Sequence, residues 1–110
     1  MKDIDFKLLV KDDNNAIYEV YLRKRMIGKI YITKEKESAV IKYDFKEHEF
    51  SSLTGVLLLN EILISALCDF KDCKESKIYF KEDQLIDYYD DVFAITKKTE
   101  NENVCYSLKR

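Results

Sequence analysis

Several kinds of residue are scarce in this chain of 110 residues, and each scarcity excludes a class of protein. Proline is absent and glycine occurs only twice, so we find neither a linker nor a repeat and predict one domain over residues 1–110. The three cysteines are an odd number and lack C-x-x-C spacing. They indicate reduced thiols rather than a disulfide framework or a zinc site, and we expect no metal.

Long apolar runs and an excess of one charge are also missing. The 19 basic and 21 acidic residues leave a net charge of −2, which argues against a nucleic-acid-binding face. The longest apolar stretch, residues 53–67, is interrupted by Asn60 and Glu61 and is shorter than the ~20 residues of a membrane span. No apolar signal region follows Met1. We therefore expect a soluble cytoplasmic protein with neither nucleic-acid nor membrane partners.

Apolar and polar residues alternate along the first part of the chain, a period typical of half-buried strands. The alternation runs through residues 4–8, 16–23, 26–33 and 39–46. Polar segments separate these stretches, and residues 12–15 are all turn formers. Four strands joined by short turns predict an antiparallel meander.

The period then changes to that of a helix. Residues 53–70 carry apolar side chains at helical spacing over a wide face, which predicts a helix packed on a sheet. The remaining segments predict a strand at 76–80, a short acidic helix at 82–91, and strands at 92–99 and 104–108. The fold class is therefore α/β (α+β), with a mixed, mostly antiparallel sheet and two helices in the order ββββ-α-β-α-ββ.

This order, with three sequence segments, resembles the GNAT superfamily of acetyl-CoA-dependent N-acetyltransferases over roughly Tyr18 to Leu108. Residues 28–32 (GKIYI) resemble the family's G-x-I-x-I strand, and residues 55–66 (GVLLLNEILISA) resemble its G-x-x-L-L-x-x-L-I-x-x-A helix. Residues 85–93 (LIDYYDDVF) resemble its fY-e-k-l-G-F segment with the glycine deleted. The resemblance implies an acyl-CoA N-acyltransferase-like fold, whose sheet splays open between the fourth and fifth strands.

The resemblance also implies an acetyl-CoA site at the start of the long helix. In the family, backbone N–H groups of a glycine-containing loop and the helix N-terminus hold the cofactor pyrophosphate. Gly55 matches the one glycine of that loop that remains here, and it can equally be a glycine that permits close helix packing. The residues that match this region and the end of the fourth strand are Phe45, Ser51, Ser52, Leu53, Thr54 and Gly55.

Three catalytic candidates follow from the same resemblance. Tyr89, or Tyr88 in a shifted register, matches the family's tyrosine that protonates the departing thiolate, and a tyrosine there can also simply anchor a short helix. Glu47 or His48 is placed to deprotonate an amine, although both residues also suit a surface loop. The implied reaction transfers an acetyl group from acetyl-CoA to an unidentified small-molecule or protein amine.

Departures from the family pattern support a second hypothesis. Phe50 stands where the family has Arg or Gln, Leu53 replaces the first glycine, and Glu47 and Glu49 bring negative charge close to a phosphate. The two helices that usually follow the first strand are replaced by the turn at residues 12–15. The alternative is a non-catalytic GNAT-like module for protein interaction or for self-association as a homodimer. A third hypothesis is an unrelated α+β binding domain with the same element order.

Overall fold

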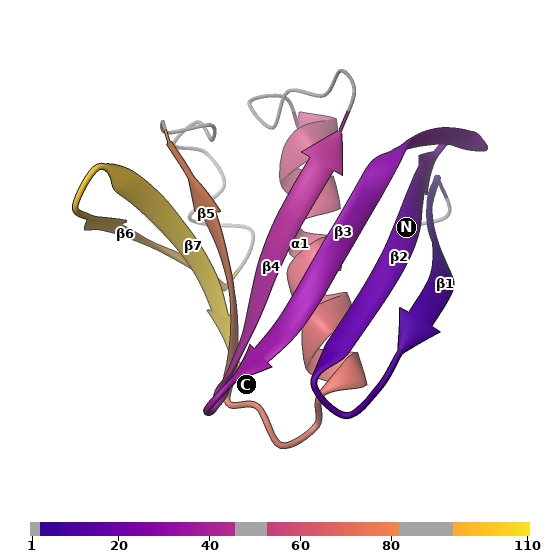
Figure 1. The fold of residues 1–110 in the computed structure, drawn as a ribbon. Coiled ribbons are helices and arrows are strands. Elements are labelled where there is room, and N and C mark those ends of the chain that lie inside the picture. The colour runs from indigo at the N-terminus through magenta and orange to yellow at the C-terminus, as the bar shows by residue number, and fades with distance from the viewer. Residues whose placement is uncertain (1–2, 46–52, 82–93) are drawn as a thin grey trace.

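The computed structural model describes residues 3–45, 53–81 and 94–110. Within these ranges, seven strands form one sheet in the order β1-β2-β3-β4-β5-β7-β6, and one helix covers one face of it (Figure 1). We refer to the face away from this helix as the open face. The elements are β1 (Ile4–Lys11), β2 (Asn15–Leu22), β3 (Arg25–Glu35), β4 (Ser38–Phe45), α1 (Leu53–Asp69), β5 (Glu75–Phe80), β6 (Ile95–Glu100) and β7 (Asn103–Lys109).

The first four strands form the antiparallel meander that the alternation predicted. Between β1 and β2, the Asp12 Oδ1 atom accepts hydrogen bonds from the backbone N–H groups of Asn14 and Asn15, each at 2.8 Å. Between β2 and β3, Arg23 and Lys24 have φ angles of 53° and 67°. Two successive positive φ angles give a hairpin turn whose twist matches that of the flanking strands. The polar spacers of the sequence are therefore tight turns.

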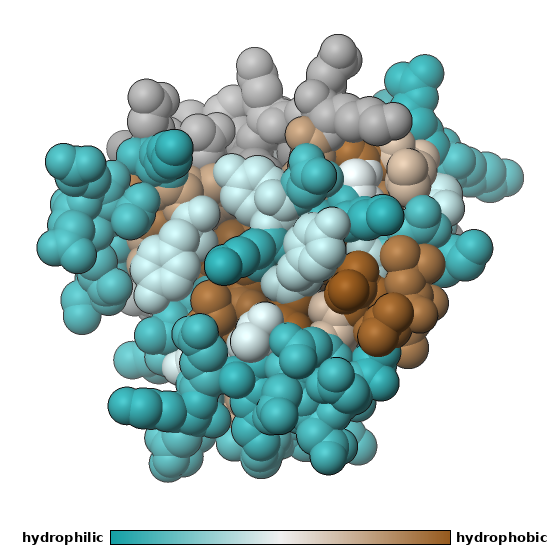
Figure 2. Space-filling view, viewed as in Figure 1, coloured by the Kyte–Doolittle hydropathy of each residue, from teal (hydrophilic) through white to brown (hydrophobic). Residues whose placement is uncertain are grey.

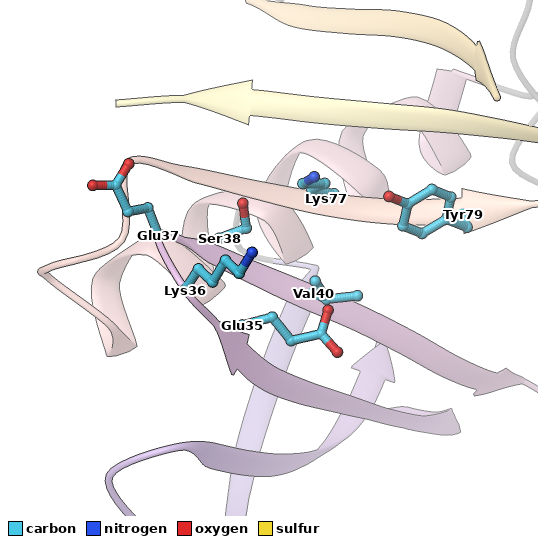
Figure 3. A pocket seen from close by; sticks show the side chains of 7 residues that line it. All are labelled: Glu35, Lys36, Glu37, Ser38, Val40, Lys77 and Tyr79. Carbon is cyan, nitrogen blue, oxygen red and sulfur yellow. The ribbon is translucent and has the colours of Figure 1, made fainter.

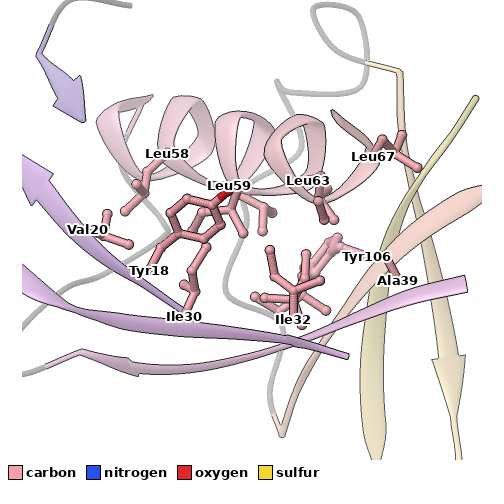
Figure 4. Close-up of a cluster of buried hydrophobic side chains, with 14 of the residues drawn as sticks. Tyr18, Val20, Ile30, Ile32, Ala39, Leu58, Leu59, Leu63, Leu67 and Tyr106 are labelled. Carbon is pink, nitrogen blue, oxygen red and sulfur yellow. The ribbon is translucent and has the colours of Figure 1, made fainter. Parts of the chain in front are cut away.

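Alternate strand residues meet α1 and form the core (Figure 4). Two polar contacts tie the helix to the sheet. The Tyr18 hydroxyl donates to the Asp69 carboxylate at 2.6 Å, and the buried Ser76 Oγ donates to the Leu63 carbonyl oxygen at 2.8 Å. Burial of apolar surface provides the main stabilisation of such a two-layer fold. The largest fully buried side chains are Tyr106, Phe80, Ile30, Ile32, Ile41, Leu58, Leu59, Ile62, Leu63, Ile78 and Val20.

Helix α1 connects β4 to β5, and these two neighbouring strands run parallel. The other pairs among the described strands are antiparallel, so the sheet is mixed and mostly antiparallel, as predicted. Arg110 hydrogen-bonds to carbonyl groups at the C-terminal end of α1. Its Nε donates to the Cys73 carbonyl oxygen at 2.9 Å, and one terminal guanidinium nitrogen donates to the carbonyl oxygens of Leu67 and Phe70 at 2.5 and 3.2 Å. A cation at a helix C-terminus is favourable because it satisfies unpaired carbonyl groups.

Most boundaries agree with the sequence-based expectations, although β1 extends to Lys11 where 8 was predicted and β6 begins at Ile95 where 92 was predicted. Helix α1 ends at Asp69 where the periodicity predicted 70, whereas the second predicted helix, residues 82–91, lies outside the described residues. No helix in the described ranges is long and apolar enough to cross a membrane. The three cysteines are free: Cys68 is exposed, whereas Cys73 and Cys105 are buried.

Candidate functional site in the cleft between β4 and β5

The parallel strands β4 and β5 pair over half their length and then separate (Figure 1). Pairing joins residues 38–41 to residues 75–78, after which β4 continues to Phe45 and β5 to Phe80 without a shared register. The sequence resemblance predicted this opening between the fourth and fifth strands. It leaves a space of about 630 Å³, which we name the β4–β5 cleft, lined by Val40, Ile41, Lys42, Tyr43, Tyr79, Phe80 and Lys81.

The size of the facing side chains differs between the two ends of this strand pair. At the paired end, Ala39 lies opposite Ser76, and both are fully buried beneath α1. At the separated end, the rings of Tyr43 and Phe80 face each other with their centroids 5.2 Å apart, and Phe80 also contacts the Tyr106 ring at 5.6 Å. Ile41 and Ile78, which are larger and also buried, form the last pair, and beyond them aromatic rings fill the space between the separated strands.

Gly28 controls how closely β3 approaches the end of β4. It lies opposite Phe45 and has a φ of 155°. A Cβ atom at this position would lie 2.7 Å from the Phe45 Cα and would also overlap the Asp44 carbonyl oxygen. Backbone atoms cannot move aside as a flexible side chain can, so this position requires glycine. The glycine of the G-x-I-x-I motif thus permits β3 to lie close to the end of β4.

Two tyrosines bring hydroxyl groups to the cleft. Tyr79 belongs to the open face, since its neighbours Ile78 and Phe80 are buried toward α1, and Tyr43 approaches from the helix side beside Phe80. Burial raises the pKa of both phenols, so each stays protonated at neutral pH and is able to donate a hydrogen bond. Burial also raises the pKa of the Cys105 thiol, which lies opposite Tyr79, so Cys105 is a weak nucleophile there.

A second hollow adjoins the cleft on the open face (Figure 3). It shares Val40 and Tyr79 with the cleft and has a volume of about 580 Å³. Its charged groups have both signs. The Lys77 Nζ lies 3.4 Å from the Glu75 Oε1, which also accepts a hydrogen bond from the Ser38 Oγ at 2.9 Å. The residues that line this open-face hollow are Glu35, Lys36, Glu37, Ser38, Val40, Lys77 and Tyr79.

The N-terminus of α1 lies at the same end of the molecule as the open end of the cleft (Figure 1). The first turn of α1 holds no acidic residue, so no carboxylate in that turn offsets the positive potential of the helix N-terminus. Within the turn, Thr54 is half-buried and Gly55 is buried. A helix start of this kind can hold an anionic group.

The structure describes part of the predicted site. Phe45 ends β4, Leu53 begins α1, and Thr54 and Gly55 lie in its first turn. Among the described residues that line the β4–β5 cleft, none of these four is included. The predicted residues Glu47, His48, Ser51, Ser52 and Tyr89 lie outside the described residues.

Sequence reasoning missed three side chains that line the cleft, namely Tyr43, Tyr79 and Phe80. The sequence did contain a signal that could have found these three residues. The resemblance placed an opening between the fourth and fifth strands, and these residues occupy the last part of those two strands.

Comparison with known proteins agrees with this geometry. No protein-family model and no curated protein matches the sequence. Among solved structures, N-acetyltransferase PseH of Campylobacter jejuni in complex with acetyl coenzyme A matches with a TM-score of 0.55 and 19% identity, over 90% of this chain and 70% of that one. A GNAT family acetyltransferase from Elizabethkingia anophelis with acetyl-CoA bound matches over 100% of both chains, with a TM-score of 0.57 and 12% identity.

The chain has the GNAT fold. PaiA N-acetyltransferase from Thermoplasma acidophilum, in complex with coenzyme A, is a further match, with a TM-score of 0.54 and 15% identity over 88% of this chain and 62% of that one. At identities this low the likeness establishes the GNAT fold alone. Within that fold, the β4–β5 cleft is the place where the parallel strands of this chain separate.

Proposed function

We propose that this protein is a GNAT-like N-acetyltransferase that binds acetyl-CoA in the β4–β5 cleft and acts on an amine held on the open face. The observation that carries the proposal is the separation of two parallel strands into a cleft of about 630 Å³, at the end of the molecule where α1 begins. Two solved structures with the same fold contain acetyl-CoA. The fold and the cleft therefore support one function.

The residues of the cleft fit the parts of the cofactor. An extended amide-containing chain such as pantetheine can lie between two separated strand edges and hydrogen-bond to them as an added strand does. The pyrophosphate suits the first turn of α1, where Thr54 and Gly55 lie and no acidic residue is present. Leu53 stands in the sequence where the family pattern has a glycine, so we expect weaker binding than that glycine would give.

Bound acetyl-CoA supplies its acetyl group as an activated thioester. On the protein side, Glu47 or His48 takes the proton from the amine, and the Tyr89 hydroxyl is the proton donor, as the sequence resemblance implies. Tyr79 holds a neutral hydroxyl at the cleft and can orient a ligand there by hydrogen bonding. No metal ion is needed for this chemistry.

The open-face hollow is the proposed place of the amine, because it shares Val40 and Tyr79 with the cleft. Glu35 and Glu37 at its rim favour a cationic ammonium, and Lys77 favours an acidic group on the same molecule. A small-molecule amine and a protein amine both suit an exposed hollow of this kind.

The first test is calorimetric titration with acetyl-CoA, with thermal melting alongside. We expect a micromolar dissociation constant and a higher melting temperature, because a ligand of the folded state stabilises it by mass action. Binding that stays absent at millimolar acetyl-CoA would contradict the proposal.

A matched pair of variants tests the helix N-terminus. Thr54→Asp places a carboxylate in the first turn of α1, where it favours the helix but repels a phosphate. We expect the affinity for acetyl-CoA to fall about tenfold or more, while Thr54→Asn, of the same shape without the charge, keeps most of it. Equal affinities for the two variants would place the phosphates elsewhere.

A further inference from the structure

The two edges of the sheet differ sharply in polarity. At the β6 edge, residues 96–99 are all exposed and polar, and the Lys98 Nζ lies 3.8 Å from the Glu100 Oε1. At the β1 edge, Leu8, Leu9 and Val10 are 48%, 41% and 53% exposed. Figure 2 shows a strongly hydrophobic patch on the same side of the open face as β1. Charged edge strands resist pairing with another chain, whereas an exposed apolar edge strand invites it.

The backbone of β1 also presents hydrogen-bonding groups outward. The Arg23 N–H donates to the Asp3 carbonyl oxygen at 2.7 Å, which fixes Asp3 and Arg23 as a hydrogen-bonded pair at the start of the β1–β2 ladder. Hydrogen-bonded and non-hydrogen-bonded pairs alternate along an antiparallel ladder. The N–H and C=O groups of Ile4, Phe6 and Leu8 therefore turn away from β2, toward the outer side of the edge.

We propose that two copies of this chain form a dimer by pairing their β1 strands in antiparallel fashion about a two-fold axis at Phe6. This register places Phe6 opposite Phe6, and Ile4 opposite Leu8 of the second copy. It uses the outward-facing backbone groups of all three residues on both copies. The two sheets become one continuous sheet across the axis.

Side-chain charge favours this register over one centred on Lys7. On the open face, Asp5 lies opposite Lys7 of the second copy, and the two-fold axis repeats this pair of opposite charges. A register centred on Lys7 instead would place two lysines directly opposite each other, and like charges in that position oppose pairing. Asp5 and Lys7 are both exposed in one copy, so they are available for this contact.

Apolar contact adds to the pairing on the helix side. Leu8 lies opposite the core residue Tyr18, so its side chain shares the α1 face of the sheet, and it is 48% exposed in one copy. Pairing with Ile4 of the second copy covers part of that surface. Five residues from each strand make a small interface, so we expect a dimer that dissociates on dilution rather than a permanent one.

The proposed dimer leaves the β4–β5 cleft untouched, because β2 and β3 separate β1 from β4. Acetyl-CoA titration and the oligomeric state are thus independent measurements. If the chain dimerises but does not bind acetyl-CoA, the dimer proposal stands and the proposed function fails. If it binds acetyl-CoA but stays monomeric, the proposed function stands and the dimer proposal fails.

Sedimentation over a concentration series, with charge-reversal variants, tests the proposal. We expect a monomer–dimer equilibrium for the native chain. Asp5→Lys and Lys7→Asp should each weaken the dimer about tenfold or more, because each turns both attractive pairs into repulsive ones. An equimolar mixture of the two variants should form a heterodimer, and the double variant Asp5→Lys/Lys7→Asp should regain the homodimer.

Lys98→Glu, at the β6 edge, is the matched control and should leave the dimer unchanged. Circular dichroism checks that every variant is folded, and formation of the heterodimer itself requires two folded partners. A native chain that is monomeric at all concentrations would overturn the proposal. So would a dimer that is indifferent to the Asp5 and Lys7 reversals.

Discussion

The two ends of the β4–β5 strand pair make an instructive comparison. At one end, Ala39 and Ser76 meet under α1 and the strands are hydrogen-bonded. At the other end, Tyr43 and Phe80 fill the space with their rings and the strands have separated. The same two strands are therefore hydrogen-bonded to each other at one end and line the β4–β5 cleft at the other end. The paired end holds the small residues Ala39 and Ser76 and, further along, Ile41 opposite Ile78, whereas aromatic rings occupy the space where the strands have separated.

The largest expected effect comes from removing the ring at the separated end. Phe80→Ala leaves a cavity beside Tyr43 and Tyr106, so the free energy of unfolding should fall by about 3–5 kcal/mol in urea denaturation. Tyr79→Phe changes the neighbouring residue without creating a cavity and should cost less than about 1.5 kcal/mol. A loss below about 1 kcal/mol for Phe80→Ala would show that this ring does not support the cleft.

A smaller but still large effect is expected where β3 approaches the cleft. Gly28→Ala introduces a Cβ that meets the backbone of Asp44 and Phe45, and we expect a destabilisation of about 3 kcal/mol. Thr33→Ala, at an exposed position on the same strand, is the control and should change stability by less than about 1 kcal/mol. If alanine were accepted at position 28 without loss, the close approach of β3 and β4 would not be essential.

The paired end should respond more mildly to loss of its polar contact. Ser76→Ala removes the hydrogen bond to the Leu63 carbonyl oxygen and should lower the free energy of unfolding by about 1 kcal/mol. Ser76→Val also adds volume between the strand and α1 and should cost more than Ser76→Ala. If the native protein and the Ser76→Val variant had equal free energies of unfolding, a small side chain at position 76 would not be needed for the pairing of β4 with β5.

The smallest effect is a pH dependence confined to alkaline solution. Burial raises the pKa of Tyr43, Tyr79 and Cys105 at the separated end, so the folded state keeps protons that the unfolded chain has already lost. The free energy of unfolding should therefore fall as pH rises above about 9 and should be unaffected by these groups below about pH 8. Denaturation at a series of pH values in this range should show that the free energy of unfolding falls less steeply with pH for Cys105→Ala than for the native chain. An equally steep fall would contradict a raised pKa of the Cys105 thiol.

Much of the fold was predictable from local pattern. Alternation located the strands of the meander, and the helical spacing of residues 53–70 located α1 to within one residue. The irregular register between Leu8 and Val10 in β1 was not predicted, and the three residues there, Leu8, Leu9 and Val10, are apolar and exposed at the edge. An alternating pattern carries no sign of a bulge, since only the pairing with β2 defines one.

The place of the cleft was predictable through the family resemblance. The opening between the fourth and fifth strands was confirmed. The assignment of Phe45, Thr54 and Gly55 to a cofactor site stays a prediction, and these residues end β4 and begin α1. Tyr79 and Phe80 were read only as residues of a strand, because their contacts with Tyr43, Val40 and Cys105 join segments far apart in the chain. The proposed roles of Glu47, His48 and Tyr89 stay predictions from sequence.

The sequence by itself determined where this protein is strand and where it is helix, because side-chain period and turn residues act within a few neighbours. Only the tertiary structure decided that β4 and β5 pair at Ala39 and Ser76 and separate at Tyr43 and Phe80. Contact between residues some 37 positions apart depends on how volumes fit beneath α1. That fit is a property of the packed core and not of any local segment.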